Sequence, residues 1–148
     1  MQHLNNILIL IFFSLFSYGC NFDSPTPAGF PQKFVSCELV ILQESHPLEQ
    51  AFVKLIPVNE TEKDWSIGGY TDDKGAVIPY TYGKWKGVPP GNYKITINKI
   101  NENNKGVAFS FVELQYTQPK TTPLNLEVTK GKINQTLEVG HAVNIKMP

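Results

Sequence analysis

The chain has 148 residues, a size at which one domain with a sizeable hydrophobic core is the usual outcome. Thirteen basic residues balance thirteen acidic ones, and every basic residue is a lysine. A neutral chain without arginine lacks the basic field and the forked donors of most nucleic-acid-binding proteins, so no nucleic-acid partner is expected. Apolar residues make up 41% of the chain, which excludes disorder throughout.

The first twenty residues have the features of an export signal. Residues 7–18 are strongly apolar and carry no charge. This run is shorter than the about 20 residues that span a bilayer as a helix, and it fits the apolar centre of a secretory signal. A buried core helix would show a polar face, and this run has none.

Gly19 and Cys20 follow the apolar run directly. A small residue before a cysteine at this point resembles the lipobox of bacterial lipoproteins. The resemblance implies a diacylglyceryl thioether on Cys20, cleavage before Cys20, and attachment to a membrane through acyl chains such as palmitate. Tyr18 and Ser17 stand where the lipobox usually has a small residue and a leucine. Ordinary secretory cleavage and a retained hydrophobic anchor are therefore the alternatives.

The chain then divides into three segments. These are a lipoprotein signal peptide (1–19), a flexible tether containing Pro, Gly and Ser (20–32), and one domain (33–148). We expect the domain in the cell envelope, facing the periplasm or the cell surface. Cys37 is the second and last cysteine of the sequence, at an apolar position of a predicted strand, where a cysteine usually acts as a small buried hydrophobe. Lipid on Cys20 would leave Cys37 without a disulfide partner; an unlipidated Cys20 could pair with it.

Short apolar runs separated by Gly, Pro, Asn and Asp predict strands and turns throughout the domain. The predicted strands are 33–43, 51–57, 65–71, 76–82, 93–99, 124–128 and a last strand or pair in 136–147. Residues 107–116 fit either a strand or a packed loop, and 83–91 and 101–105 are expected to be loops. Asp72 to Gly75 predicts a hairpin turn in which Gly75 has a positive φ. About seven strands with one apolar face each predict an all-β fold, a single antiparallel β-sandwich of transthyretin-like or immunoglobulin-like type with almost no helix.

Several turn and strand motifs occur in a recognisable order. They are Pro47-Leu48, Ala51-x-Val53, Gly69-x-Thr71-Asp72-x-x-Gly75, Gly87-Val88-Pro89-Pro90-Gly91-x-Tyr93, Tyr116, Thr122-Pro123-Leu124 and Val128-x-x-Gly131. This order resembles the carboxypeptidase regulatory-like domains, which are transthyretin-like sandwiches, and most of all the short planctomycete lipoproteins of this type. The resemblance covers roughly residues 35–140 and implies fold and export, but no reaction. Independently, Tyr93 faces the core by parity, so its hydroxyl needs a hydrogen-bond partner, expected to be a nearby backbone group.

An enzyme is the least favoured function. Intradiol dioxygenases, which use a transthyretin-like core, hold iron with two Tyr and two His, whereas His46 and His141 fall in turns that nothing in the sequence places near a tyrosine. Asp72-Asp73 is explained by the predicted turn, and the ligand spacing of a calcium loop is absent. No nucleophile-elbow, zinc-helix or phosphate-loop motif occurs, so we expect no metal and no cofactor.

Four aromatic residues gather around one predicted hairpin: Trp65, Tyr80, Tyr82 and Trp85. Such a cluster can stack on sugar rings or bind a protein, or it can cover the end of the core. The sequence therefore predicts a lipid-anchored envelope module with a non-enzymatic structural or binding role. The alternative is an accessory domain that binds a glycan or an envelope protein through this aromatic edge.

Overall fold

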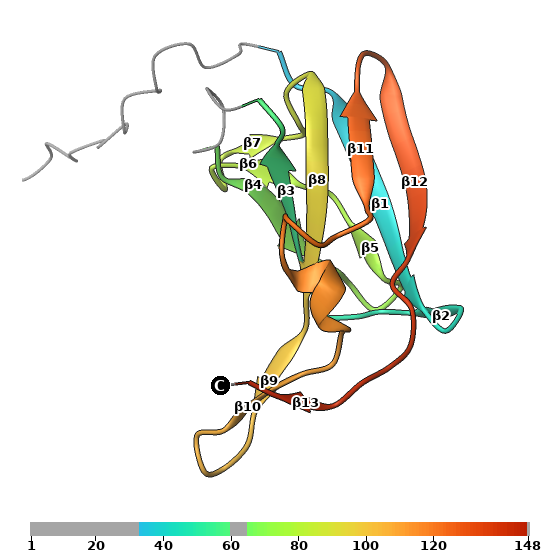
Figure 1. Ribbon diagram of the computed structural model, residues 1–148. Coiled ribbons are helices and arrows are strands. Elements are labelled where there is room, and N and C mark those ends of the chain that lie inside the picture. The colour runs from blue at the N-terminus through green and yellow to red at the C-terminus, as the bar shows by residue number, and fades with distance from the viewer. Residues whose placement is uncertain (1–32, 60–64, 148) are drawn as a thin grey trace, which may run out of the picture. The chain divides into compact units, whose positions relative to one another are not determined.

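The computed structural model describes residues 33–59 and 65–147, and these residues form an all-β sandwich (Figure 1). The predicted fold class is confirmed. One short 3₁₀-helix, η2 (Leu114–Thr117), is the helical element within these ranges. None of the described residues form a helix that is long and apolar enough to cross a membrane. The predicted signal peptide, Cys20 and the tether lie outside the described residues.

The larger sheet has six antiparallel strands in the order β11-β8-β3-β4-β6-β7. Their bounds are β3 (Phe52–Pro57), β4 (Ile67–Tyr70), β6 (Tyr80–Thr81), β7 (Trp85–Lys86), β8 (Gly91–Asn98) and β11 (Asn125–Val128). The register pairs Leu55 with Ile95 and Val53 with Ile97, so these apolar side chains share the inner face.

The second sheet is built on β1 (Ser36–Gln43). Its partners are β2 (His46–Pro47), β5 (Ala76–Val77) and β12 (Lys132–Glu138). β12 runs parallel to β1 over its whole length, so the expectation of purely antiparallel sheets is wrong at this pair. The reason is that β11 and β12 lie in different sheets, and the short connection between them crosses the sandwich instead of closing a hairpin (Figure 1).

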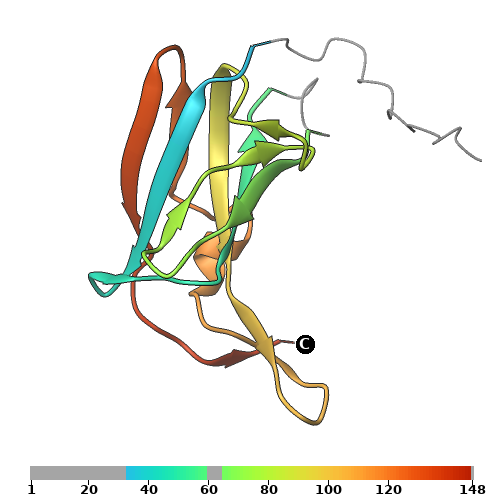
Figure 2. The same ribbon diagram turned by 180° about the vertical axis from the view of Figure 1, so that it is seen from behind.

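A small third sheet lies beyond the lower end of β8 and has the order β13-β10-β9 (Figure 2). Its strands are β9 (Ile100–Glu102), β10 (Ala108–Ser110) and β13 (Ile145–Lys146). The predicted loop 101–105 is corrected in part, because Asn101 and Glu102 belong to β9 and only the following residues turn. The last predicted strand, 136–147, is also corrected: β12 begins at Lys132, and an irregular segment separates it from β13.

The predicted strand 76–82 is divided between the two sheets. β5 pairs with β1 in one sheet, whereas β6 pairs with β4 in the other. Pro79 lies between β5 and β6, and its missing N–H prevents a continuous ladder at that point. β6 then returns as β7 through a tight turn in which Tyr82 has φ 51°, so the predicted loop 83–91 contains a strand.

The predicted turn from Asp72 to Gly75 is confirmed, but the predicted hairpin is not, because the strands on its two sides, β4 and β5, pair in different sheets. The Asp72 Oδ1 atom accepts hydrogen bonds from the backbone N–H groups of Lys74 (2.9 Å) and Ala76 (2.8 Å), and Gly75 has φ 71°. A side chain at Gly75 would collide with the backbone oxygen of Ile41, because the turn lies directly against β1. The turn therefore leads from β4 of one sheet to β5 of the other.

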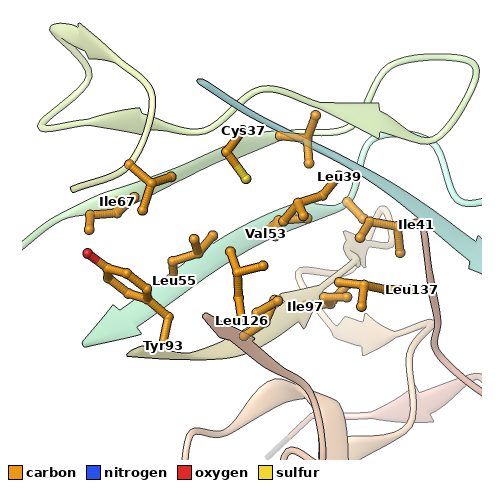
Figure 3. Packing of buried hydrophobic residues seen from close by; sticks show 14 of the residues in the cluster. Cys37, Leu39, Ile41, Val53, Leu55, Ile67, Tyr93, Ile97, Leu126 and Leu137 are labelled. Carbon is orange, nitrogen blue, oxygen red and sulfur yellow. The ribbon is translucent and has the colours of Figure 1, made fainter. Parts of the chain in front are cut away.

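The core lies between the two large sheets and draws on both (Figure 3). Cys37 is fully buried in it, as predicted, and burial raises the pKa of its thiol to about 11. The Tyr93 side chain is also buried, and its hydroxyl donates to the Pro89 backbone oxygen at 2.8 Å. The expected backbone partner of Tyr93 is thus confirmed. Full burial of each large apolar side chain in this core contributes about 1.5–3 kcal/mol to the free energy of unfolding.

Candidate functional site

The four aromatic residues singled out in the sequence do not form one surface. Trp65 is partly buried and packs against the hydrophobic core, so it shields part of the core from solvent. Tyr80 and Trp85 belong to the β6–β7 hairpin, but they stand on opposite faces of it: Trp85 pairs with the buried Thr81, whereas Tyr80 pairs with the exposed Lys86.

Trp85 is held within a small aromatic cluster at the edge of the sandwich. Its ring stacks on Phe34, with centroids 6.1 Å apart and planes 8° apart, and meets Tyr82 edge-on at 6.3 Å. The Lys84 ammonium lies 5.2 Å from the centre of the Trp85 ring, within reach of a cation–π interaction. The half-buried Trp85 therefore joins β7 to Phe34 in the segment before β1, and it stabilises the end of the core.

The outer face of the six-stranded sheet carries a second group of aromatic residues, which joins Tyr80 to two rings that the sequence pattern did not single out, Phe52 and Tyr70. Phe52 and Tyr70 are directly opposite each other on β3 and β4, with ring centroids 5.0 Å apart at an angle of 49°. Tyr70 is 71% exposed and Tyr80 is 40% exposed. We call the following residues the aromatic face: Phe52, Lys54, Gly68, Tyr70, Tyr80 and Lys86. The alternation along β3 could have indicated its members on that strand, because Phe52 and Lys54 alternate with the inward-facing Val53 and Leu55.

A separate polar cluster lies where the β1–β2 turn meets the segment after β12. His141 Nδ1 is 3.2 Å from Glu44 Oε1, and His46 Nδ1 is 2.7 Å from the Glu44 backbone oxygen. No local pattern in the sequence indicates that the two histidines, 95 positions apart, approach the same glutamate. All three side chains are exposed to solvent, so this cluster is an open surface arrangement.

Glu113 fixes the backbone on the other side of His141. Its Oε1 accepts a hydrogen bond from the His141 backbone N–H at 2.9 Å, and its Oε2 accepts one from the Gln115 amide at 2.7 Å. These two bonds, the His141 bond first, lower the pKa of Glu113 below its usual value of 4.5. Glu113 therefore holds the segment after β12 as an ionised group.

A shallow depression of about 500 Å³ adjoins the Glu44 cluster. It is lined by Gln43, Glu44, His46, Pro47, Leu48, Glu49, Asp73, Lys99 and Ala142. Across residues 33–59 and 65–147, no three His, Cys, Asp or Glu side chains come together in a way that could hold a metal ion.

No family model and no curated protein matches the chain. Among solved structures, the chain is similar to the major pilin subunit BcpA of Bacillus cereus, with 18% identity and a TM-score of 0.45. That alignment covers 72% of this chain and 30% of the pilin. A 9R-lipoxygenase from Cyanothece PCC8801 aligns at 14% identity and a TM-score of 0.40, over 78% of this chain and 18% of the enzyme. This chain spans less than a third of either structure, and neither likeness assigns it an activity or a partner.

Proposed function

We propose that the chain is a lipid-anchored, non-enzymatic module of the cell envelope with a structural or binding role. The support for the anchor is in the sequence: the apolar run 7–18 ends at Gly19-Cys20, and a tether follows it. The lipid on Cys20 attaches the module to a membrane, and residues 20–32 connect it to the sandwich. The resemblance to planctomycete lipoproteins with a carboxypeptidase regulatory-like domain agrees with this role.

The observation that supports a binding role is the aromatic face. Tyr70 is 71% exposed on a regular strand, beside the half-buried ring of Phe52. An aromatic ring that contributes little to the core is a common anchor of protein and glycan contacts, because it offers a large rigid surface at small entropic cost. A glycan or another envelope protein is therefore the partner class of this module.

The anchor is tested by the intact mass of the native protein extracted from membranes. We expect the mature chain to begin at Cys20 and to carry the added mass of the acyl groups. Cys20→Ser should leave the protein unprocessed or release it from the membrane, whereas Cys37→Ala serves as the matched control and should remain anchored. A mature N-terminus at another residue, or an unmodified Cys20 bonded to Cys37, would contradict the proposal.

The second candidate is an accessory domain that binds a carbohydrate or a protein through Trp65, Tyr80, Tyr82 and Trp85. The exposure of Tyr80 favours a contact at this end of the sheet. The packing of Trp65 on the core and of Trp85 on Phe34 favours a structural role for those two rings. Trp85→Ala separates the two roles of this ring, because a structural role predicts a loss of stability and a ligand contact predicts a loss of binding alone.

A further inference from the structure

The aromatic face is a continuous row across four strands. The pairing register places Lys54, Gly68, Tyr80 and Lys86 side by side on β3, β4, β6 and β7. Neighbouring strands are about 4.8 Å apart, so the two lysines at the ends of this row are separated by about 14 Å along the sheet surface. Figure 1 shows these four strands at the end of the sheet farthest from β11.

Gly68 gives the centre of this row its flat shape. A Cβ atom at Gly68 would lie 3.3 Å from the Phe52 Cζ atom and would collide with the Val53 backbone oxygen. The Phe52 ring therefore lies over bare backbone, with Tyr70 opposite it and Tyr80 beyond Gly68. Glycine inside a strand often marks a place where another group approaches the backbone closely, and here that group is the Phe52 ring, which lies where a side chain at Gly68 would need space.

The charges of the aromatic face have one sign. Lys54 and Lys86 are exposed and form no ion pair with a described residue, and the described outward positions of β3, β4, β6 and β7 carry no carboxylate. Among the described residues of the six-stranded sheet, Glu127 on β11 is a carboxylate on the outer face. β8 lies between β11 and β3, so Glu127 is remote from the aromatic face. A partner with negative charges would thus meet two unpaired ammonium groups, one on each side of Tyr80.

Aromatic rings next to lysines suit two classes of polyanion, single-stranded nucleic acid and acidic polysaccharide. Proteins that bind nucleic acid are usually basic and rich in arginine, whereas this chain is neutral and has none. Sugar rings present apolar C–H faces that stack on tyrosine and phenylalanine, and tyrosine hydroxyls can bond to sugar hydroxyls. The spacing of the two lysines requires an extended oligomer, because a single sugar would not reach both.

We propose that the outer face of the six-stranded sheet binds a polysaccharide of uronic acids. Phe52, Tyr70 and Tyr80 stack on the sugar rings, and Lys54 and Lys86 pair with the carboxylates. This inference names the ligand for the binding role proposed above, and it does not depend on the lipid at Cys20. Trp65 and Trp85 remain parts of the folded edge and do not contact the ligand.

The test is a titration of the purified full chain, kept in an uncharged detergent, with alginate oligosaccharides as the polyuronate probe. We expect binding that weakens as salt is added, since two exposed ion pairs contribute to it. Tyr80→Ala should weaken binding about tenfold, in the range found for other aromatic stacking contacts. Lys54→Gln and Lys86→Gln should each weaken it about threefold to fivefold, with no change in the thermal unfolding midpoint.

Matched variants show whether the effect belongs to this face. Lys105→Gln removes an exposed lysine from the β9–β10 turn, and Trp85→Phe alters the aromatic cluster on the opposite side of the β6–β7 hairpin; both should bind as the parent does. Equal affinity for neutral dextran oligosaccharides would overturn the proposal, because the lysines would then have no role. Tighter binding of oligo-deoxythymidine would overturn it in favour of nucleic acid, and unchanged binding by Tyr80→Ala would place the site elsewhere.

The same experiment separates this inference from the proposed anchor. If Cys20→Ser leaves the membrane but still binds alginate, both proposals stand. If the native protein carries lipid on Cys20 and binds no uronate oligosaccharide, the ligand assignment fails while the anchor stands. If the mature protein begins elsewhere and still binds alginate through Tyr80, the anchor fails and the ligand assignment stands.

Discussion

Cys37 shows how one residue takes its chemistry from its position. It lies on β1 among Leu39, Ile41 and other fully buried side chains, and no water reaches its sulfur. Burial disfavours the charged thiolate, which raises the pKa of the thiol to about 11. A thiol in this environment is a packing group and not a nucleophile.

We therefore predict that Cys37 reacts with thiol reagents only after unfolding. In the Cys20→Ser variant it is the sole thiol, and at pH 8 about one molecule in a thousand would carry it as a thiolate. Ellman's reagent should give no reaction with the native protein and one thiol per chain in denaturant. Rapid labelling without denaturant would show that β1 opens or that Cys37 is exposed.

The β6–β7 hairpin has one face exposed to solvent and one face that packs against the sandwich. Tyr80 and Lys86 point to solvent on one face, and Thr81 and Trp85 point inward on the other. The Trp85 ring stacks on Phe34, so the hairpin is attached to the start of the second sheet as well as to β4. Removing this ring should loosen the edge of the sandwich.

Trp85→Ala is thus predicted to lower the free energy of unfolding by about 1–3 kcal/mol, less than for a fully buried tryptophan because the ring is only half-buried. Urea unfolding followed by circular dichroism measures this loss. Tyr70→Ala, which removes a ring that is 71% exposed, is the control and should change the stability by less than about 0.5 kcal/mol. If Trp85→Ala were as stable as the parent, the Trp85 ring would have no structural role and would be available for ligand binding.

The segment after β12 is held by a carboxylate whose pKa is lowered, so its attachment should depend on pH. The stability that Glu113 contributes is complete above its usual pKa of 4.5, and it is lost as the pH falls through the lower value of the folded state. We predict that the His141 backbone N–H signal in NMR spectra shifts with a midpoint below 4.5. Glu113→Gln should abolish this transition; a midpoint above 4.5 would contradict the assigned hydrogen bond.

The whole molecule depends on a contact between segments that are far apart in the chain. β1 pairs with β12 from Ser36 opposite Lys132 to Leu42 opposite Glu138. Leu137 and Val139 are buried in the core at the end of this pair. The long parallel pairing therefore closes the second sheet, and β5 and β2 cover only short parts of β1.

A chain that ends at Gly131 should consequently fail to fold cooperatively. It loses every hydrogen bond of β12 and two buried core side chains, and it exposes the edge of β1. A chain that ends at Asn144 loses only β13 from the small third sheet, and it should retain a thermal transition. If the shorter chain unfolded as cooperatively as the longer one, the parallel pair would not be essential to the sandwich.

The amino-acid sequence by itself determined which side chains are inside. Alternation with a period of two placed Val53, Leu55 and Tyr93 in the core, and the Asp72 to Gly75 pattern specified its turn. These features are local, because backbone geometry sends successive side chains of a strand to opposite faces and a few nearby groups satisfy each turn. The predicted partner of the Tyr93 hydroxyl is local as well, only four residues away.

Only the tertiary structure decided which strands are neighbours. The parallel pairing of β1 with β12, the division of 76–82 between two sheets and the approach of both histidines to Glu44 depend on long-range packing. The aromatic face is of the same kind, since Lys54, Tyr80 and Lys86 meet through the register of four strands. Periodicity states which face a side chain is on, but the burial of the whole core selects the partner strand and hence the surface that is formed.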